Sequence, residues 1–123
     1  MTREELQRLL DWYDKFETGK GDIEGIMKAR QRLSLHCTTI AKELAQVETT
    51  HKLTYQERRI SEAERFLEQE GTIAEREANA INKELRRKEA QAESAVKGYK
   101  ILLDSYFKVL DAMASQINVM NKL

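Results

Sequence analysis

One pair of neighbouring residues, His36 and Cys37, could supply nucleophilic chemistry. A cysteine nucleophile needs an imidazole that faces it, but adjacent side chains on a helix point about 100° apart. A lone cysteine among apolar residues is more typical of a packed core than of a reactive site. The second histidine, His51, is too distant along the chain to share a metal ion with His36 on one helix. We therefore expect Cys37 to be a buried structural thiol, and we expect no metal site.

The glycines and carboxylates offer no catalytic motif. Gly19 and Gly21 precede no expected strand and lack the Lys-Ser/Thr pair of a phosphate-binding loop. The acidic residues alternate with basic ones, as they do on solvated helix faces. We predict that the chain is not an enzyme and that it uses no cofactor.

Basic residues are more informative, because they gather locally and could contact phosphates. Between Ile26 and Lys42 the chain has four basic residues and no acidic one. Further clusters lie at residues 52–59 and 83–88. The 21 basic and 21 acidic residues leave a formal net charge of zero, so any basic surface must be local. A basic run on a helix is usually only a solvated face, and that alternative stays open here.

Helices must position these residues, because proline is absent and 34% of the residues are charged. Such a composition favours helix throughout the chain. Thr2 and Glu5 form a capping box. The helix that they open should end at a turn over residues 18–21, where two glycines accept positive φ. Trp12 lies off the apolar face of this helix, either at the edge of the packed surface or as a group that stacks on a ligand.

A second helix is expected to begin after Asp22, which can cap it. Heptad spacing predicts an apolar seam along it, made of Ile26, Leu33, Cys37, Ile40, Leu44 and Val47. The seam changes phase near residues 49–54, and the new one consists of Leu53, Ile60, Ala63 and Leu67. A bend, a stutter or a short loop would each explain this change.

Gly71 suits the end of a helix, and Thr72 with Glu75 can cap the helix that follows. A heptad frame then runs from Ala78 to Met120, through Ile81, Leu85, Lys88, Ala92, Ala95, Tyr99, Leu102, Tyr106, Val109, Met113 and Gln116. Gly98 lies inside this frame and costs about 1 kcal/mol relative to alanine, so it marks a candidate hinge.

From Ile101 onward, the last helix carries more apolar surface than one neighbouring helix can cover. Burial of each such side chain contributes roughly 1.5–3 kcal/mol, so we predict that this segment assembles more than two copies of the chain. Burial within a single chain is the alternative. The predicted assembly residues are Leu102, Leu103, Tyr106, Phe107, Leu110, Met113, Ile117 and Met120.

These patterns predict an all-α fold of long helices with heptad seams, in which the C-terminal helix forms a helical oligomerisation core. We divide the chain into an N-terminal helix and turn (1–21), a helical body with a candidate DNA-binding face (22–98) and an apolar C-terminal assembly helix (99–123). The single cysteine favours a reducing compartment, and neither an apolar leader nor an apolar run of about 18 residues is present. We expect a cytoplasmic protein that does not enter a membrane.

Residues 38–48 carry a resemblance to a known family. Their sequence, Thr-Thr-Ile-Ala-Lys-Glu-Leu-Ala-Gln-Val-Glu, resembles a segment of the UvsY family, the recombination mediators of T-even phages. That family segment has Ser-Ser-Ile, Lys-Glu-Met and Ile-Glu at matching spacing. Residues 101–104 (Ile-Leu-Leu-Asp) and 110–113 (Leu-Asp-Ala-Met) are similar to the family's Ile-Leu-Leu-Asp and Leu-Asp-Ala-Ile. The resemblance covers roughly residues 37–120, and it has no clear counterpart for Trp12.

The resemblance implies a function. UvsY-like proteins are helical, form rings of subunits and bind single-stranded DNA. They help to load a RecA-like recombinase onto DNA that is covered by single-strand-binding protein. The resemblance thus implies single-stranded DNA, a RecA-like recombinase and single-strand-binding protein as partners, and the host cytoplasm as the location if the chain is phage-encoded. The alternative is a coiled-coil structural or adaptor protein that binds other proteins and no nucleic acid.

The family's DNA-contacting basic stretch falls on residues 52–59 of this chain. We therefore expect DNA contacts from Lys52, Arg58 and Arg59, with Lys42 and Arg65 as outer contributors. The chain departs from the family at Gln56, where the family has a second lysine, although Arg59 could supply that charge. Two nearby acidic residues, Glu57 and Glu62, also weaken the correspondence.

Overall fold

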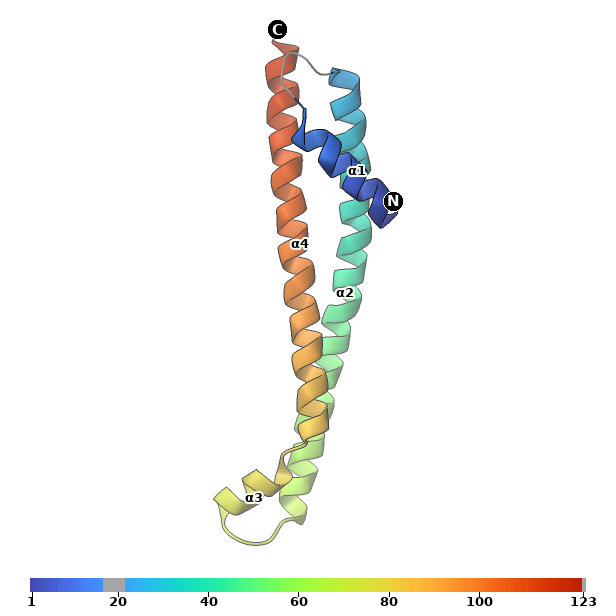
Figure 1. The fold of residues 1–123 in the computed structure, drawn as a ribbon. Helices are drawn as coiled ribbons and strands as arrows, with labels where there is room; N and C mark the ends of the chain where they lie inside the picture. The colour runs from blue at the N-terminus through green and yellow to red at the C-terminus, as the bar shows by residue number, and fades with distance from the viewer. Residues whose placement is uncertain (17–21, 123) are drawn as a thin grey trace. The chain divides into compact units, whose positions relative to one another are not determined.

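The computed structural model describes residues 1–16 and 22–122, and in them it contains four helices and no strand. The helices are α1 (Arg3–Asp14), α2 (Ile23–Glu68), α3 (Ile73–Ala80) and α4 (Lys83–Asn121) (Figure 1). This arrangement confirms the predicted all-α fold with long helices. The turn expected at residues 18–21 lies outside the described residues.

The first two helices begin where the capping residues predict. At the start of α1, the Glu5 amide donates to Thr2 Oγ1 at 3.1 Å, and the Glu5 carboxylate accepts from the Thr2 amide at 3.1 Å. Both halves of the capping box are therefore present. At the start of α2, Asp22 Oδ1 accepts from the Glu24 amide at 3.0 Å. Each bond satisfies a backbone donor that has no partner within its helix.

Two helices meet where the sequence predicts only one. Thr72 caps α3 as expected, through a 3.2 Å bond from the Glu75 amide. The helix then stops at Ala80, because Ile81 is extended, with φ −59° and ψ 126°. Asn82 caps α4, its Oδ1 accepting from the Leu85 amide at 3.1 Å. An asparagine is one of the best capping residues, so the heptad frame that we expected to run unbroken from Ala78 is interrupted at this point.

The helices form two compact units, which we describe separately. Unit 1 comprises Met1–Lys42 and Ile101–Leu123, and so contains α1, the beginning of α2 and the end of α4. Unit 2 comprises Glu43–Lys100, and contains the rest of α2, α3 and the beginning of α4. Unit 1 is built from two separate stretches of chain, whereas unit 2 is one continuous stretch.

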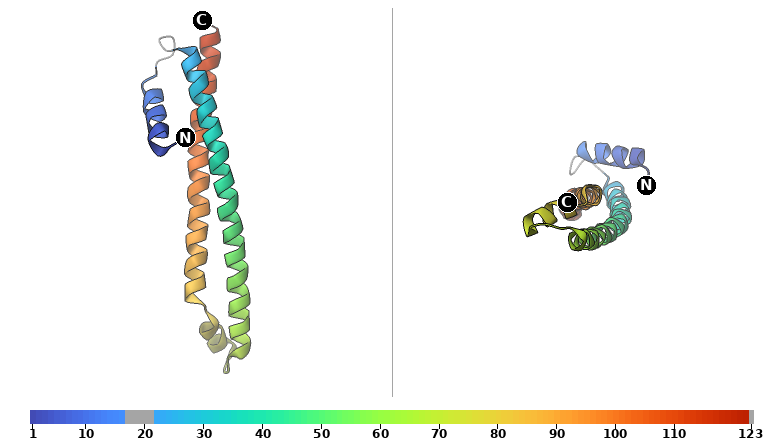
Figure 2. Two further views of the ribbon diagram at one scale, coloured as in Figure 1. Left: turned by 90° about the vertical axis from the view of Figure 1, so that its right-hand side faces the viewer. Right: turned by 90° about the horizontal axis from the view of Figure 1, so that it is seen from below.

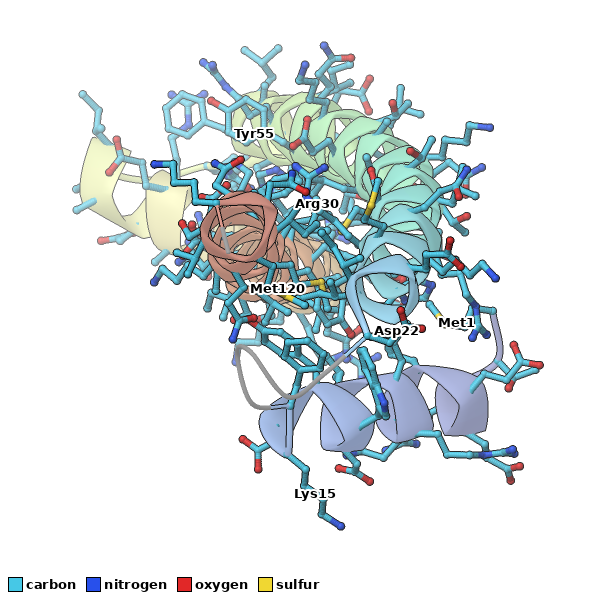
Figure 3. All side chains as sticks on the ribbon, turned by 90° about the horizontal axis from the view of Figure 1, so that it is seen from above. Met1, Lys15, Asp22, Arg30, Tyr55 and Met120 are labelled. Atoms are coloured by element: carbon cyan, nitrogen blue, oxygen red, sulfur yellow. The ribbon has the colours of Figure 1, made fainter. Side chains whose placement is uncertain are left out.

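In unit 1, α2 and α4 lie antiparallel around an apolar core. Arg30 Nε donates to the Leu110 carbonyl at 3.4 Å, and Figure 3 shows Arg30 between the two helices. The rings of His36 and Tyr106 meet edge-on, with centroids 5.7 Å apart. Cys37 is buried, as predicted, and burial raises the pKa of its thiol. The buried side chains of the unit are Leu6, Leu9, Ile26, Ala29, Leu33, Cys37, Ile40, Leu103, Tyr106, Leu110 and Met113.

The buried positions on the apolar part of α4 differ from the predicted frame. Tyr106 and Met113 are buried as expected, but Leu103 and Leu110 take the places expected for Leu102 and Val109. Leu102 remains 37% exposed. The covered residues Leu85, Tyr106 and Met113 keep the predicted seven-residue repeat. The difference lies between them, because the chain covers the residue four positions after Tyr106 and not the residue three positions after it.

Unit 2 has few fully buried apolar side chains. Only two of its apolar residues, Ala80 and Leu85, are buried. Here α2 and α4 again run antiparallel, and Figure 2 shows α3 as a short helix at an angle to the two helices that it joins. The predicted second seam does not face α4, because Leu53, Ile60 and Leu67 are 61%, 60% and 76% exposed.

Helix α2 passes through residues 49–54 without a break, so the change of seam needs neither a bend nor a loop. Helix α4 is also continuous through the candidate hinge Gly98. Gly71 has φ +110°, a conformation that glycine adopts at little cost, and it lies in the connection between α2 and α3.

Candidate nucleic-acid interface

The five predicted DNA-contact residues have different surroundings. Lys42 is exposed in unit 1, and Lys52, Arg59 and Arg65 are exposed in unit 2. Arg58 differs from them, because only 19% of its side chain is exposed. Four of the predicted residues, Lys52, Arg58, Arg59 and Arg65, thus lie in one stretch of α2. Arg58 is largely shielded from solvent there.

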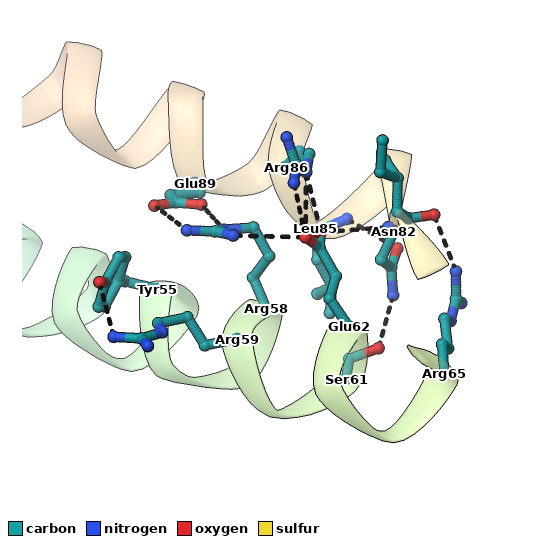
Figure 4. Close-up of polar contacts among 11 residues, drawn as sticks. Tyr55, Arg58, Arg59, Ser61, Glu62, Arg65, Asn82, Leu85, Arg86 and Glu89 are labelled. Carbon is teal, nitrogen blue, oxygen red and sulfur yellow. Dashed lines mark hydrogen bonds and ion pairs between the residues drawn. The ribbon is translucent and has the colours of Figure 1, made fainter. Parts of the chain in front are cut away.

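Arg58 is held between two carboxylates (Figure 4). Its Nε donates to Glu89 Oε2 on α4, and its Nη2 donates to Glu89 Oε1 at 3.5 Å. Its Nη1 donates to Glu62 Oε1 at 3.4 Å. Arg86 completes the cluster from α4, with Nη2 at 2.7 Å from Glu62 Oε1 and Nε at 2.9 Å from Glu62 Oε2.

The cluster keeps its charges balanced. The bond from Arg86, followed by the Asn82 backbone amide and the charge of Arg58, lowers the pKa of Glu62 to about 2 against the opposing effect of burial. The bond to Glu89 likewise raises the pKa of Arg58. Two arginines thus face two carboxylates, and Arg58 joins α2 to α4. Arg58 therefore has a structural contact in this fold, and its predicted role as a phosphate contact stays a prediction.

The other predicted cations of unit 2 are more accessible. Arg59 donates to the Tyr55 hydroxyl at 3.1 Å, and its guanidinium carbon lies 5.7 Å from the centre of that ring. Arg65 donates to the Ile81 carbonyl at 3.2 Å and so ties α2 to the α3–α4 connection. Lys52 borders a shallow hollow of about 350 Å³ that it shares with three carboxylate or imidazole groups and two lysines. The other lining residues are Glu48, His51, Glu93, Val96, Lys97 and Lys100.

A large hollow lies between α1 and the beginning of α2, within unit 1. It has a volume of about 770 Å³ and is open to solvent. Four of its lining residues are basic, two are acidic and two are aromatic. We call it the α1–α2 cleft, and its lining residues are Glu5, Arg8, Leu9, Trp12, Lys15, Phe16, Asp22, Gly25, Lys28, Ala29 and Arg32.

Packing of α1 on α2 creates this cleft. Leu6 and Leu9 are buried and anchor α1, while Glu5 and Arg32 form an ion pair at 3.8 Å between the two helices. Small residues on α2 leave room for the indole ring. A Cβ atom at Gly25 would lie 3.5 Å from Trp12 Cζ2, so the ring contacts the α2 backbone closely.

The cleft combines aromatic rings with cations, of which Arg32 is paired with Glu5 and Lys28 is not paired within the described ranges. Trp12 is 40% exposed and packs against Phe16 in a tilted arrangement, with ring centroids 5.3 Å apart. Lys28 has no carboxylate partner among the described residues, and no acidic residue lies between Gly25 and Lys42 on α2. Lys15 also borders the cleft, although Figure 3 shows its side chain extending from α1 on the side away from α2.

The sequence contains signals for the separate parts of this cleft but not for their proximity. The acid-free basic run and the off-face position of Trp12 are both visible in the sequence. Their proximity depends on how α1 docks on α2, which heptad spacing does not specify. Glu89 and Arg86 were missed in the same way, because their contacts with Arg58 and Glu62 depend on the register between α2 and α4.

The predicted assembly residues of α4 divide into two sets. Leu103, Tyr106, Leu110 and Met113 are buried by their own chain, which is the alternative that the sequence left open. The other four are exposed or half-buried, namely Leu102, Phe107, Ile117 and Met120. The same helix also presents an uncharged heptad row that its own chain covers only in part. We call it the α4 outer row, and it consists of Leu102, Ser105, Val109, Ala112, Gln116 and Val119.

The described residues contain neither a metal-binding cluster nor a membrane-spanning helix. No group of three or more histidine, cysteine or acidic residues is placed to hold a metal ion there. None of the helices in the described ranges is long and apolar enough to cross a membrane. No protein family, no curated protein and no solved structure matches the chain. The resemblance of residues 38–48 to the UvsY family therefore stays a prediction.

Proposed function

We propose that the chain is a single-stranded-DNA-binding recombination mediator that works as a homo-oligomer and helps to load a RecA-like recombinase onto DNA covered by single-strand-binding protein. The recombinase and single-strand-binding protein follow from the UvsY resemblance. The observation that carries DNA binding is the α1–α2 cleft, which Trp12, Lys28 and Arg32 line together. We place the principal DNA contact here rather than at Arg58, whose charge is already balanced.

Single-stranded DNA is recognised by cations that follow the backbone and by aromatic rings that stack on bases. Lys28 and Arg32 are four residues apart and so lie on one face of α2, next to the exposed indole of Trp12. Lys42 lies about 21 Å from Lys28 along α2, at about 1.5 Å per residue, and no acidic residue lies between them in the sequence. These features suit a flexible, negatively charged strand, and they give no base-specific contacts.

Assembly would raise the affinity for DNA, because several copies would each add a weak contact to the same strand. Because the chain has no net charge, one copy offers only a small basic surface. Several copies that hold one strand together gain from a raised effective concentration. The α4 outer row is suited to such assembly, since its spacing is that of a helix seam and it has no charged member.

The decisive experiment is a titration of labelled oligo-dT with the full chain, followed by fluorescence anisotropy at two salt concentrations. Binding should weaken as salt rises, because counterions are released from the phosphates. The variant Lys28→Ala/Arg32→Ala should bind several-fold more weakly and should lower the slope of log K against log salt by roughly 0.7 per lost contact. The matched control is Lys83→Ala/Arg87→Ala, which removes two exposed cations at the same spacing from α4.

Two results would contradict the proposal. One is the absence of salt-sensitive binding by the wild type, and the other is an equal loss of affinity in the control. The alternative function, a coiled-coil structural or adaptor protein, would then be favoured. A specific observation supports that alternative, because unit 2 exposes large aliphatic side chains of α2 that suit contact with a protein.

A further inference from the structure

In unit 2, the side of α2 that packs on α4 is polar, whereas the side that faces solvent is apolar. The face that packs on α4 carries Thr54 and the charged cluster of Arg58 and Glu62. The large aliphatic residues Leu53, Ile60 and Leu67 are instead on the opposite side, where they are 60% to 76% exposed. At about 100° per residue these three lie within about 40° of one another, and Arg58 lies about 160° from Ile60. A row of exposed aliphatic residues opposite a covered polar face indicates a missing partner.

The spacing of this row is that of a two-stranded coiled coil. Leu53, Ile60 and Leu67 recur every seven residues and occupy the a positions of a heptad, and Gln56 and Ala63 occupy the d positions. We call these five residues the α2 outer row. The row is confined to unit 2 and contains no charged residue.

The residues that flank the row define the partner and its direction. On one side, the g positions are basic, with Lys52 and Arg59. On the other side, the e positions are acidic, with Glu57 and Glu64. All four are exposed, and among the described residues none of them forms an ion pair within the chain. In a parallel pair of helices, each g residue faces the e residue five positions later in the partner.

A second copy of the same chain satisfies this pattern only when it is parallel. Lys52 then faces Glu57 of the second copy, and Arg59 faces Glu64 of the second copy. An antiparallel copy would place g beside g and e beside e, so that like charges would meet at every flanking position. We propose that the α2 outer row joins two copies of this chain as a short parallel coiled coil, in register, with ion pairs between Lys52 and Glu57 and between Arg59 and Glu64.

The helices that would pair are already formed before the two copies associate. A free peptide of two heptads would be marginal, because helix nucleation is costly. Residues 53–67 are already helical within α2, and Arg58 and Glu62 secure that part of α2 to α4. The ordering cost of association is therefore small. The proposal is independent of DNA binding, and it concerns a surface different from the α4 outer row.

Charge reversal tests the pairing. In sedimentation of the full chain over a range of concentrations, Lys52→Glu/Arg59→Glu should weaken association by roughly tenfold or more, and Glu57→Lys/Glu64→Lys should do the same. An equimolar mixture of the two variants should restore association, because each then carries the flanks that the other needs. Failure of the mixture to associate more strongly than either variant alone would overturn the proposal.

Cysteine cross-linking tests the direction and separates this contact from any contact through α4. In a Cys37→Ser background, Leu53→Cys should form disulfide-linked dimers with itself on mild oxidation, and Leu67→Cys should do so too. Ile73→Cys is the control, because Ile73 is exposed on α3 outside the row. In a mixture of the two variants, cross-linking only between position 53 of one copy and position 67 of the other would show an antiparallel pair. Cross-linking no faster than the control would show no pair. Either result would overturn the proposal.

Discussion

At the scale of single residues, Arg58 and Glu62 show how context decides what a charged side chain does. The same guanidinium could contact phosphate if it were exposed, but here two carboxylates accept its hydrogen bonds. Glu62 accepts from Arg58, Arg86 and the Asn82 amide, and only 13% of its side chain is exposed. A partly buried group with this many partners contributes to stability, whereas exposed ion pairs contribute little.

Glu62→Gln should therefore destabilise the chain at neutral pH by about 2–3 kcal/mol. The pKa of Glu62 falls from 4.5 to about 2 on folding, so its contribution is complete above pH 4.5 and is lost as the pH falls toward 2. The difference in unfolding free energy between wild type and variant should shrink over that interval. Chemical denaturation at several pH values measures it, with the exposed Glu68→Gln as control. An unchanged difference from pH 6 to pH 2 would refute the assignment.

Trp12 offers a direct test of the proposed cleft, because it is the only tryptophan in the chain. Stacking of a base on its exposed ring should quench its fluorescence when oligo-dT is added. Trp12→Ala should weaken binding by about 1–3 kcal/mol, while Trp12→Phe, which keeps a stacking surface, should lose less. An oligonucleotide without bases should bind with little quenching. Binding by anisotropy that leaves Trp12 emission unchanged would place the DNA elsewhere on the chain.

At the scale of the elements, α2 carries two apolar rows on different sides. Its first half buries Ile26, Leu33 and Ile40 within unit 1, and its second half exposes Leu53 and Ile60 in unit 2. The helix remains continuous for 46 residues, because backbone hydrogen bonding does not depend on which face is covered. The apolar row therefore changes sides along α2 without a break in the helix.

At the same scale, the stability of α4 should depend on Gly98. It lies inside α4, its φ is not positive, and a Cβ atom there would meet nothing within 4 Å. Gly98→Ala should raise the free energy of unfolding by about 0.5–1 kcal/mol, because alanine loses less backbone entropy in a helix. Thermal unfolding followed by circular dichroism measures this change. A decrease in stability would mean that Gly98 contacts another copy or serves as a hinge.

At the scale of the whole molecule, each unit has one uncharged row of side chains that its own chain leaves wholly or partly exposed. Unit 1 presents the α4 outer row, and unit 2 presents the α2 outer row. Two different self-contacts on one chain can build assemblies larger than a dimer, because each copy then joins two others. Such an assembly would repeat the α1–α2 cleft once per subunit and so present one strand of DNA with several weak sites.

Neighbouring leucines on α4 distinguish folding from assembly. Leu103 is 7% exposed, so Leu103→Asp should bury a charge and destabilise unit 1 by about 3 kcal/mol or more. Leu102 is 37% exposed and belongs to the α4 outer row, so Leu102→Asp should leave the chain folded but lower its assembly mass. Circular dichroism and sedimentation measure the two effects, and Met27→Asp, at an exposed site of the same unit, is the control. An unchanged mass for Leu102→Asp would exclude the α4 outer row from assembly.

The sequence by itself determined the features that depend on neighbours along the chain. Helix starts at Thr2, Asp22 and Thr72 were predictable because a capping side chain bonds an amide two or three residues away. The burial of Cys37 followed from its place between Leu33 and Ile40 in the apolar seam. These signals act within one helix, so they need no knowledge of what packs against it.

Only the tertiary structure decided which face of each long helix is covered. Leu103 rather than Leu102 is buried, Ile60 faces solvent, and Arg58 meets Glu89 because of the register between α2 and α4. The α1–α2 cleft also depends on docking, since residues of α1 and α2 far apart in sequence line it. Heptad spacing describes a row of side chains but does not state whether the same chain or another covers it. That choice depends on the free energy of packing between helices, which no local pattern contains.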